Sequence, residues 1–353
     1  MQINTAVLST VLKIIVFGLF ALLSGILLIT NLFEFTNFYP SHKKSYTAHK
    51  GFVCSDVSAT LTSLNEEYTI EQSIESIAPY VGEVVVVEHG STDSTPKILQ
   101  KLSQKYPNII VKNGGSLLPY SESNNLGYML SSKPWILPWA ADYFLYPNAA
   151  KKICSLIEYC EKQNIQIVNY SIPRIDGDIN HVYSSKVNGE VIEERLFKRG
   201  AVITRQTAKY VDSKIVPLTK IRSTTSDQFF QIHAASFKNA ERLYYSNHMK
   251  EYLIYHNFEV AKVKNPMPFW DWEYCRLHDT NTTGKADIQA FKKQRMEKFC
   301  KELILPYSSF DHKKWGPIPS YLKKLPFFKK FGIKYIKDDE NGNKLYRPTV
   351  PGC

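Results

Sequence analysis

The chain has 353 residues, of which 44% are hydrophobic, and its 44 lysines and arginines against 33 acids give a net charge of +11. This apolar and aromatic content excludes a disordered protein, and the length allows one large domain or two ordinary ones. Six cysteines without a CxxC pair exclude a disulfide scaffold and a zinc site of that type. Buried thiols are the simplest interpretation, and the sequence leaves their pairing open. A charge of +11 raises nucleic acid or an anionic membrane as a partner.

Most of the positive charge lies at the carboxyl end of the chain. Residues 291–353 carry +9, which leaves only +2 for the first 290 residues. Nucleic-acid-binding domains combine a basic face with a reading motif, and the chain has no helix-turn-helix, zinc-finger or RNP pattern, so we predict no nucleic-acid partner. Residues 321–331 alternate lysine pairs with large apolar residues, which indicates contact with an anionic bilayer. The alternative is a solvated, partly helical extension.

An uncharged run of 20 residues, 14–33, stands near the amino terminus. A helix of this length spans roughly 30 Å, the thickness of the hydrocarbon core of a bilayer. The run is longer than the apolar part of a cleaved signal peptide. We therefore predict a signal anchor within residues 1–33 and a single-pass membrane protein, in the ER or Golgi membrane of a eukaryote or otherwise in the cytoplasmic membrane.

The sequence contains conflicting signals about membrane orientation. Lys43, Lys44 and Lys50 follow the apolar run and favour a cytosolic location for the larger part of the chain. Two N-x-S/T sequons, at Asn169 and Asn281, have a function only in a secretory lumen. Asn169 lies in a predicted strand, so Asn281 is the better acceptor, and the orientation stays open.

After a polar stem at residues 34–52, strand-like and helix-like segments alternate. Short β-branched runs predict strands, and apolar residues at helical spacing predict helices. We predict strands at residues 57–64, 83–88, 108–112 and 135–137, and helices at residues 70–78, 94–105 and 123–130. This order predicts an α/β domain with a mostly parallel sheet covered on both faces. Such sheets bind ligands at the carboxyl ends of their strands.

Polar residues follow these predicted strands. The first strand is followed by Asn65-Glu66-Glu67, and the second by Glu88-His89-Gly90-Ser91-Thr92-Asp93. The second stretch reads as a tight turn into a helix, whose first N–H groups can bind an anion such as a diphosphate. Taken alone, an ordinary capped turn also explains it. Further along stand Asn125 and, after the fourth strand, Ala140-Ala141-Asp142.

In this order the pieces resemble the nucleotide-sugar half of glycosyltransferase family 2, which has the GT-A fold. The family pattern is NEE, then VVDDGSTDGT, then an Asn before a strand that ends in D-x-D. Residues 170–174 and 195–200 resemble segments of its lipopolysaccharide-core glucosyltransferase-like branch. The resemblance covers residues 55–245. It implies a domain at residues 53–280, with a nucleotide-sugar half at 53–150 and an acceptor half at 151–280, before a basic extension at 281–353.

The resemblance implies transfer of a sugar, with inversion, from a nucleotide-sugar, commonly a UDP-sugar, to a glycan, lipid-linked or protein acceptor. It places these residues at the donor: Asn65, Glu66, Glu88, Asp93 (mainly as a helix cap) and Asn125. Asp142 is the last acid of D-x-D and is expected to hold Mn²⁺ or Mg²⁺ beside the departing diphosphate.

Two positions depart from the family pattern. His89 replaces the second Asp of D-D-G-S, and Ala140 replaces the first Asp of D-x-D. One carboxylate, with donor phosphates and waters, is chemically sufficient for a divalent cation, so we expect an active enzyme. The alternative is a catalytically inactive relative that binds a glycan or a nucleotide at the membrane.

A further carboxylate must take the proton from the acceptor hydroxyl. In the family this base follows D-x-D by most of a domain, and Asp227 is our first choice. Asp271 and Glu273 are alternatives because their aromatic surroundings suit the face of a sugar. His233 and His248 are further alternatives.

Overall fold

The computed structural model describes residues 53–114, 120–175, 178, 180–183, 191–207, 210–218, 221–234, 237–257, 267–326, 328–340, 342 and 344–353. All of these residues belong to one structural unit, Ser41–Cys353. The predicted anchor at residues 14–33 and the predicted stem at residues 34–52 lie outside the described residues. Of the helices that are described, none is long and apolar enough to cross a membrane.

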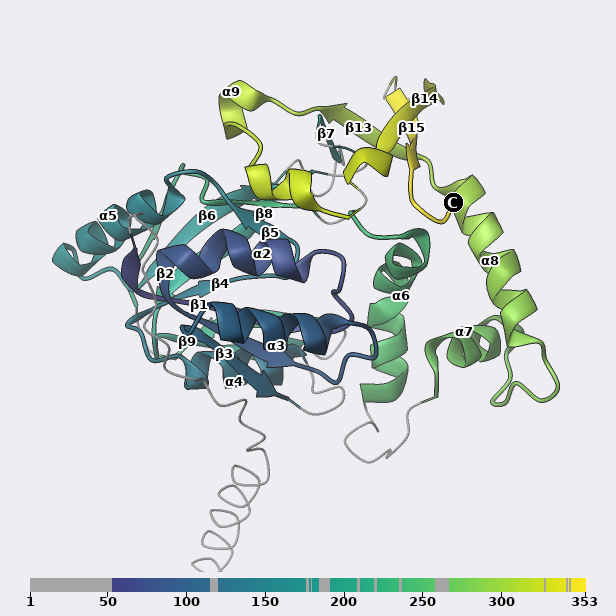
Figure 1. Ribbon diagram of the computed structural model, residues 1–353, viewed down its shortest axis with the longest axis horizontal. Coiled ribbons are helices and arrows are strands. Elements are labelled where there is room, and N and C mark those ends of the chain that lie inside the picture. The colour runs from purple at the N-terminus through teal and green to yellow at the C-terminus, as the bar shows by residue number, and fades with distance from the viewer. Residues whose placement is uncertain are drawn as a thin grey trace, which may run out of the picture. The chain divides into compact units, whose positions relative to one another are not determined.

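A seven-stranded sheet with the order β11-β6-β8-β4-β1-β2-β3 forms the centre (Figure 1). Its strands are β1 (Cys54–Ser63), β2 (Val81–Glu88), β3 (Ile109–Asn113), β4 (Trp135–Pro138), β6 (Ile167–Pro173), β8 (Val191–Lys198) and β11 (Ser223–Thr225). The strands β4, β1, β2 and β3 are parallel, and β11 is parallel to β6. Only β8 is antiparallel to its neighbours. The prediction of a mostly parallel α/β sheet is confirmed.

Helices cover both faces of this sheet. Those of the first half are α2 (Ile70–Ile77), α3 (Thr95–Lys105), α4 (Tyr120–Leu130) and α5 (Ala149–Lys162). The path from β1 to β2 and β3 runs one way across the sheet, whereas β4 lies on the other side of β1. Figure 1 shows α2 and α3 side by side on one face. Because parallel connections are right-handed, the reversal places α4 on the opposite face.

Burial explains why these segments form where the sequence predicts them. Residues 84–87 of β2 are fully buried, as expected for a strand between two layers of helix. Helix α2 buries Ile70, Ile74 and Ile77, which lie on one face of the helix. The predicted strands and helices of the first half are therefore confirmed, with bounds that differ by a few residues.

The direction of the strands sets the position of the candidate site. Because β8 is antiparallel to both β4 and β6, the strands β6 and β11 point the same way as β1, β2 and β4. Their carboxyl ends therefore share one edge of the sheet, and the strand order reverses there between β1 and β4. Such a reversal is where open α/β sheets bind their ligands. The residues at this edge include Glu88, the last residue of β2, and Glu66, Asp142 and Asp227, which follow β1, β4 and β11.

The second half of the domain adds smaller elements. These are the antiparallel pair β5 (Tyr143–Leu145) and β12 (Gln231–His233), the pair β9 (Val202–Thr207) and β10 (Tyr210–Pro217), and the helices α6 (Ala240–Asn257), α7 (Phe269–His278) and α8 (Ile288–Glu302). Pairing of β12 with β5 sets His233 opposite Tyr143, directly after Asp142. Figure 1 shows α6 at the end of the sheet where α2 and α3 begin. Helix α6 thus stands at the carboxyl edge of the strands.

The carboxyl-terminal segment packs against the rest of the domain. It contains β13 (Leu305–Ser309), α9 (His312–Trp315), the 3₁₀ turns η2 (Ser320–Lys324) and η3 (Phe328–Lys330), β14 (Gly332–Asp338) and β15 (Lys344–Thr349). A four-stranded sheet of order β14-β15-β13-β7 joins it to β7 (His181–Tyr183) of the acceptor half. Leu322, Leu325 and Phe331 belong to the same hydrophobic core as β1. These apolar side chains therefore contribute to the fold.

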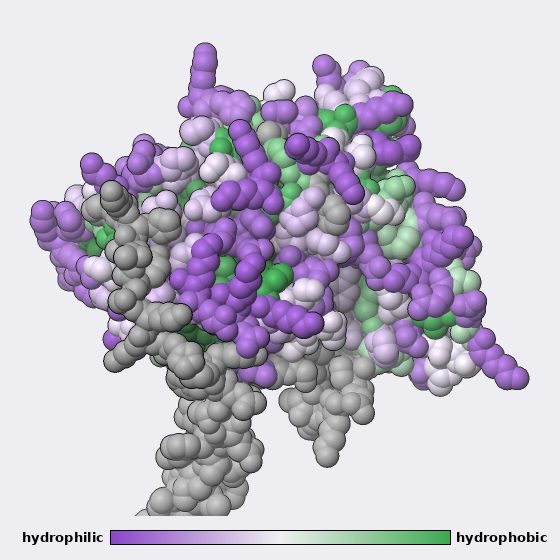
Figure 2. Space-filling view, in the orientation of Figure 1, coloured by the Kyte–Doolittle hydropathy of each residue, from purple (hydrophilic) through white to green (hydrophobic). Residues whose placement is uncertain are grey.

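This burial bears on the predicted bilayer contact of residues 321–331. Their apolar side chains Leu322 and Leu325 face the protein core, while Lys323 and Lys324 are exposed. The face of the molecule in Figure 2 is mostly hydrophilic, with hydrophobic residues in small separate groups. Of the segment's described residues, mainly the lysines remain available to an anionic surface, and the membrane contact stays a prediction.

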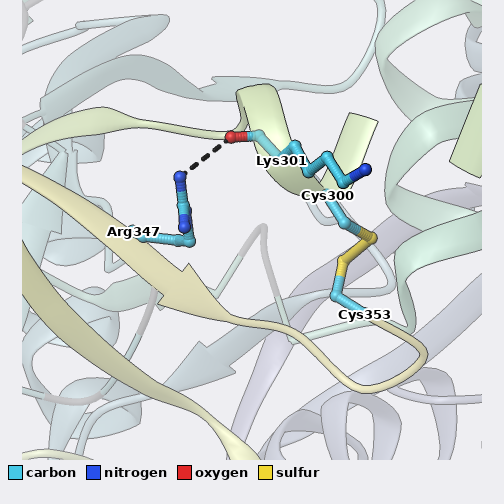
Figure 3. The surroundings of a disulfide bond; sticks show 4 residues. All are labelled: Cys300, Lys301, Arg347 and Cys353. Atoms are coloured by element: carbon cyan, nitrogen blue, oxygen red, sulfur yellow. Dashed lines mark hydrogen bonds between the residues drawn. A yellow bond between two sulfur atoms is a disulfide. The ribbon is translucent and has the colours of Figure 1, made fainter. Parts of the chain in front are cut away.

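Two disulfide bonds join distant parts of the chain. Cys54 at the start of β1 is bonded to Cys154 of α5, and Cys300 of α8 is bonded to Cys353. Figure 3 shows the second bond, beside which Arg347 Nη2 donates to the carbonyl oxygen of Lys301 at 3.1 Å. The remaining cysteines, Cys160 and Cys275, are buried thiols. The sequence leaves pairing open; the structure pairs four of the six cysteines and keeps these two as buried thiols.

Candidate active site

The loop after β1 and the turn after β2 hold each other in place. Asn65 has a left-handed backbone, φ 56°, which asparagine tolerates better than most residues, and its Oδ1 accepts from Thr92 N at 2.8 Å. Asp93 accepts from Thr95 N at 2.9 Å, at the start of α3, and from Glu67 N at 3.1 Å. The N-cap of α3 is Ser94, and Asp93, one residue before it, accepts from the first N–H of the helix. Direct contact of Asn65 or Asp93 with a donor stays a prediction.

The carboxylate of Glu88 is bound to its own turn. Its Oε2 accepts from Gly90 N at 2.9 Å and its Oε1 from Ser91 N at 2.7 Å, and the residue is buried. The neighbouring His89 is also buried; burial lowers its pKa, although the charge of Glu88 acts in the opposite direction. His89 is therefore neutral near pH 7, and it cannot replace the charge of the aspartate that the family pattern has there.

Asn125 of α4 is bonded to the backbone of β9. Its Nδ2 donates to Thr204 O at 2.8 Å, and its Oδ1 accepts from Thr204 N at 2.8 Å. Both ends of the amide are thus engaged in holding α4 against β9. A donor-binding role for Asn125 stays a prediction, because the observed contacts already explain an asparagine there.

Asp142 is the buried anion at the reversal of the strand order. Its Oδ2 lies 3.2 Å from Lys238 Nζ and 3.3 Å from His233 Nε2. Burial opposes ionisation of Asp142, but Lys238 and His233 outweigh it and hold the pKa of this carboxyl well below its usual range. Asp142 is therefore a carboxylate at every physiological pH, and Lys238 and His233 of the same chain contact the charged group.

The same lysine also reaches the loop after β1. Lys238 Nζ lies 3.2 Å from Glu66 Oε2, and Arg242 Nη2 lies 2.6 Å from Glu66 Oε1. Arg242 Nε also donates to Asn65 O at 2.6 Å. These side chains form what we call the ionic cluster: Glu66, Asp142, His233, Lys238 and Arg242. The cluster ties the loop after β1, the segment after β4 and the start of α6 into one polar site.

Our sequence analysis missed Lys238 and Arg242 because it searched only the residues that follow strands. Lys238 lies just before α6, and Arg242 lies in its first turn. A signal was present, since positive charges are unfavourable at the amino end of a helix, where the helix dipole is positive. Two basic residues four apart at such a position require acidic partners from elsewhere in the fold.

Asp227, the first choice for the catalytic base, lies in the loop after β11. The residue is exposed, and its strand ends at the same edge of the sheet as β1 and β4. It is therefore placed on the correct edge and is open to an acceptor. The assignment as base stays a prediction.

The alternative bases differ in their surroundings. Glu273 is fully buried, and although burial alone raises its pKa, bonds from Arg276 and Tyr244 lower it below the usual value. This carboxylate holds α6, α7 and α8 together. His248 Nδ1 contacts the carbonyl oxygen of Tyr244, in its own helix, at 2.9 Å. Both side chains have structural partners, whereas Asp271 is partly exposed and remains an alternative.

A cavity of about 370 Å³ adjoins the ionic cluster. Asn65, Asp93 and Arg242 line its polar side. The aromatic part of its lining contains Tyr245 of α6 and Phe269 and Trp270 of α7. A cavity whose lining is partly polar and partly aromatic can hold a planar base against the rings. A second hollow, of about 400 Å³, has a different lining that includes Tyr80, Tyr146 and Tyr321 and shares no residue with the cluster.

The ionic cluster does not fit the divalent cation expected at Asp142. Ala140 offers no side-chain oxygen, and its carbonyl oxygen accepts from Ser73 Oγ at 2.9 Å. The carboxylate of Glu66, which shares Lys238 with Asp142, is paired with Lys238 and Arg242. Within the described part of the chain, no group of three or more His, Cys, Asp or Glu residues could hold a metal ion. We therefore derive no catalytic step through a metal.

Comparison with known proteins supports the resemblance to a family. Residues 58–215, somewhat less than half of the chain, match the sequence model of the family described as Glycosyl transferase family 2. With the mostly parallel sheet, this match supports a GT-A-like α/β fold. It does not test the narrower resemblance to the lipopolysaccharide-core branch. No curated protein sequence matches the chain significantly.

Several solved structures are distantly similar to the chain. One is S. aureus TarS 1–349 in complex with UDP-GlcNAc, with 13% identity, a TM-score of 0.37 and coverage of 54% of this chain and 63% of that chain. Another is PcManGT, a mannosyltransferase from Pyrobaculum calidifontis in complex with GDP-Man and Mn²⁺, with 15% identity, a TM-score of 0.30 and coverage of 44% and 48%. A third is glucosyl-3-phosphoglycerate synthase from Mycobacterium tuberculosis with Mn²⁺, UDP and glucosyl-3-phosphoglycerate, with 16% identity, a TM-score of 0.33 and coverage of 54% and 77%. The chain thus spans less than two thirds of the first two, and we base no functional argument on these similarities.

Proposed function

We propose that the chain is a membrane-anchored glycosyltransferase. It moves a sugar from a nucleotide-sugar, with UDP-sugars as the first candidates, to a hydroxyl of a glycan, lipid-linked or protein acceptor. One observation carries the proposal: within a segment that matches family 2, the residues after β1, β2 and β4 meet at one edge of the sheet. A fold alone does not imply a function, so the argument depends on the chemistry of this edge.

The donor nucleotide fits between the ionic cluster and the aromatic part of the lining of the adjoining cavity. The base stacks on Trp270 or Phe269, and Asn65 lines the same cavity. The cluster shares Arg242 with the cavity and extends from there to Lys238 and Asp142. A nucleotide in this position directs its diphosphate, and the sugar attached to it, toward Lys238.

The transfer is a single displacement with inversion at the anomeric carbon. The acceptor oxygen forms its bond to this carbon from the side opposite the diphosphate, while the bond from the carbon to the diphosphate oxygen breaks. The electron pair of the broken bond stays on the diphosphate, and the proton of the acceptor hydroxyl passes to a carboxylate. Asp227 is the proposed base because it is exposed at the shared edge.

A second candidate function is a catalytically inactive relative that binds a nucleotide or a glycan. Ala140 favours it, since this position lacks the acid of the family pattern. The internal bonds of Glu88 favour it too, since both carboxylate oxygens are engaged in the turn. This candidate shares the nucleotide site with the transferase and differs from it only in turnover.

The disulfides support a location for the domain. Two disulfide bonds in one domain are typical of proteins that face an oxidising compartment. We propose that the domain lies in the ER or Golgi lumen, or outside the cell in a prokaryote, and that residues 14–33 anchor it there. The lysines at residues 43, 44 and 50 favour the opposite orientation, but they give no account of the disulfides.

Titration of the full chain with UDP tests the donor site. We expect binding, and we expect Trp270→Ala to weaken it roughly tenfold, because stacking of a base on an aromatic ring contributes about 1–3 kcal/mol. Tyr335→Ala is the control, since Tyr335 is exposed on β14 and does not line this cavity. Failure of both UDP and GDP to bind would contradict the proposal.

A further inference from the structure

The cation of the candidate site is a buried lysine held in a fixed position. Lys238 Nζ lies 3.2 Å from Asp142 Oδ2 and 3.2 Å from Glu66 Oε2, and its side chain is only 7% exposed. Lysine is rarely buried unless it is paired. Here the two carboxylates, one after β4 and one after β1, hold the ammonium group at the reversal of the strand order. Lys238 thus stands where the family pattern leads one to expect a metal ion.

The ammonium group of Lys238 has capacity left for a ligand. An ammonium carries three N–H donors. Among the described residues only Asp142 and Glu66 accept from Lys238. The remaining N–H can donate to a phosphate oxygen, and such charge-assisted bonds are the strong ones in proteins.

A divalent cation at Asp142 would meet an electrostatic obstacle. Oδ2 of this residue is already shared by Lys238 and His233, and a metal ion on the same oxygen would stand beside a like charge. The cluster is also balanced without metal, because the carboxylates of Glu66 and Asp142 face the cations of Lys238 and Arg242. Ala140 supplies no carboxylate to offset the two additional positive charges of a divalent cation.

We propose that Lys238 takes the place of a divalent cation, so that donor binding and sugar transfer do not require metal. This inference rests on the proposed function. During transfer, the bond between the anomeric carbon and the diphosphate oxygen breaks and its electron pair stays on the diphosphate. Lys238 donates an N–H bond to the oxygen that gains charge and keeps its proton, while the acceptor's proton passes to the base. Asp142, Glu66 and His233 position the ammonium group.

Nucleotide titration with and without metal tests the inference on the full chain. The probes are UDP and GDP, each titrated in excess EDTA and again in Mn²⁺. We expect dissociation constants that agree within about threefold between the two conditions. We expect Lys238→Gln to weaken binding roughly 10- to 100-fold in both, because it removes a hydrogen bond from a charged donor. Lys101→Gln is the matched control, since Lys101 forms an exposed pair with Glu71.

The outcomes separate this inference from the proposed function. Binding in Mn²⁺ but not in EDTA would overturn the inference and leave the function intact, and so would unchanged binding by folded Lys238→Gln. Absence of binding to either nucleotide in both conditions would overturn both. Lys238→Gln removes a buried cation from between Glu66 and Asp142 and can unfold the chain, so the EDTA comparison on the unaltered protein is decisive. Lys238→Arg keeps the charge, and we expect it to restore part of the binding.

Discussion

At the scale of single residues, the proposed base is an exposed carboxylate, Asp227. Asp227 is exposed after β11, in contrast to Glu273, which is buried among cationic partners. We expect Asp227→Asn to lower kcat about 100- to 10,000-fold, the usual contribution of a general base. The affinity for UDP is expected to stay unchanged, because the base contacts the acceptor.

Steady-state kinetics and UDP titration on the same protein check this prediction. Asp56→Asn is the matched control, since Asp56 is also exposed but lies near the opposite end of β1. If Asp271→Asn lost turnover while Asp227→Asn kept it, the catalytic base would be Asp271 of α7 and not Asp227.

His89 makes stability depend on pH in a defined direction. Burial lowers its pKa from the ordinary value of 6.5, so the unfolded chain binds a proton at a higher pH than the folded chain does. The free energy of unfolding therefore falls as the pH drops below about 6.5, until the folded-state pKa is reached, by at most about 1.4 kcal/mol per pH unit.

Urea unfolding at pH 7.0 and at pH 5.5 measures this effect. The decrease is expected to be smaller in His89→Gln than in the unaltered chain, whereas His278→Gln, at an exposed position, should keep it. Equal decreases in all three proteins would show that His89 is not responsible.

At the scale of elements, Arg242 in the first turn of α6 bonds to the loop after β1. Arg242 pairs with Glu66 and also donates to the carbonyl oxygens of Asn65 and Leu64. Breaking a buried pair leaves an unpaired charge, so we expect Arg242→Ala to lower the free energy of unfolding by roughly 3 kcal/mol. Urea unfolding checks this value, with Lys101→Ala as an exposed control that should change it by less than about 0.5 kcal/mol. A loss as small as that of the control would mean that the pair does not hold α6.

The elements of the first half could be predicted because their signals are local. The valines at residues 84–87 form a short β-branched run, and Ile70, Ile74 and Ile77 have helical spacing. The residues after β1, β2 and β4 could be placed at one edge because parallel strands share their direction.

The rest of the site depends on contacts between distant residues. Lys238 meets Asp142 from 96 positions away and Glu66 from 172 positions away. The antiparallel insertion of β8 between β4 and β6 is a long-range pairing of the same kind. Local periodicity and turn motifs carry no information about such long-range contacts. Neither the position of Lys238 nor the strand order in the second half of the domain could therefore be predicted from them.

At the scale of the whole molecule, the uneven charge has a structural explanation. Part of the basic excess of residues 291–353 pairs with acids of the acceptor half, as Lys292 does with Glu241 and Arg295 with Glu273. The apolar residues of the same segment lie in the common core. The extension therefore completes the fold, and its Cys300–Cys353 bond fastens the last residue of the sequence to α8.

The disulfides and the sequons together predict the cellular compartment in which the domain lies. Asn281 is exposed between α7 and α8, whereas Asn169 in β6 donates to Thr224 O and accepts from Arg195 Nε. When the full chain is expressed in eukaryotic cells, we expect an N-glycan on Asn281 and none on Asn169. A mobility shift after glycosidase treatment measures this, and Asn281→Gln should abolish the shift while Asn169→Gln keeps it. A chain without any glycan and with reduced cysteines would place the domain in the cytosol.

The central claim is that the chain transfers sugar from a nucleotide donor. Release of the nucleoside diphosphate from a panel of UDP- and GDP-sugars, by the full chain with a mixture of glycan and lipid acceptors, tests it most directly. The account predicts release that depends on acceptor, continues in EDTA and is lost in Asp227→Asn. A protein that binds UDP or GDP but releases neither from any donor with any acceptor would contradict it and identify an inactive, nucleotide-binding relative.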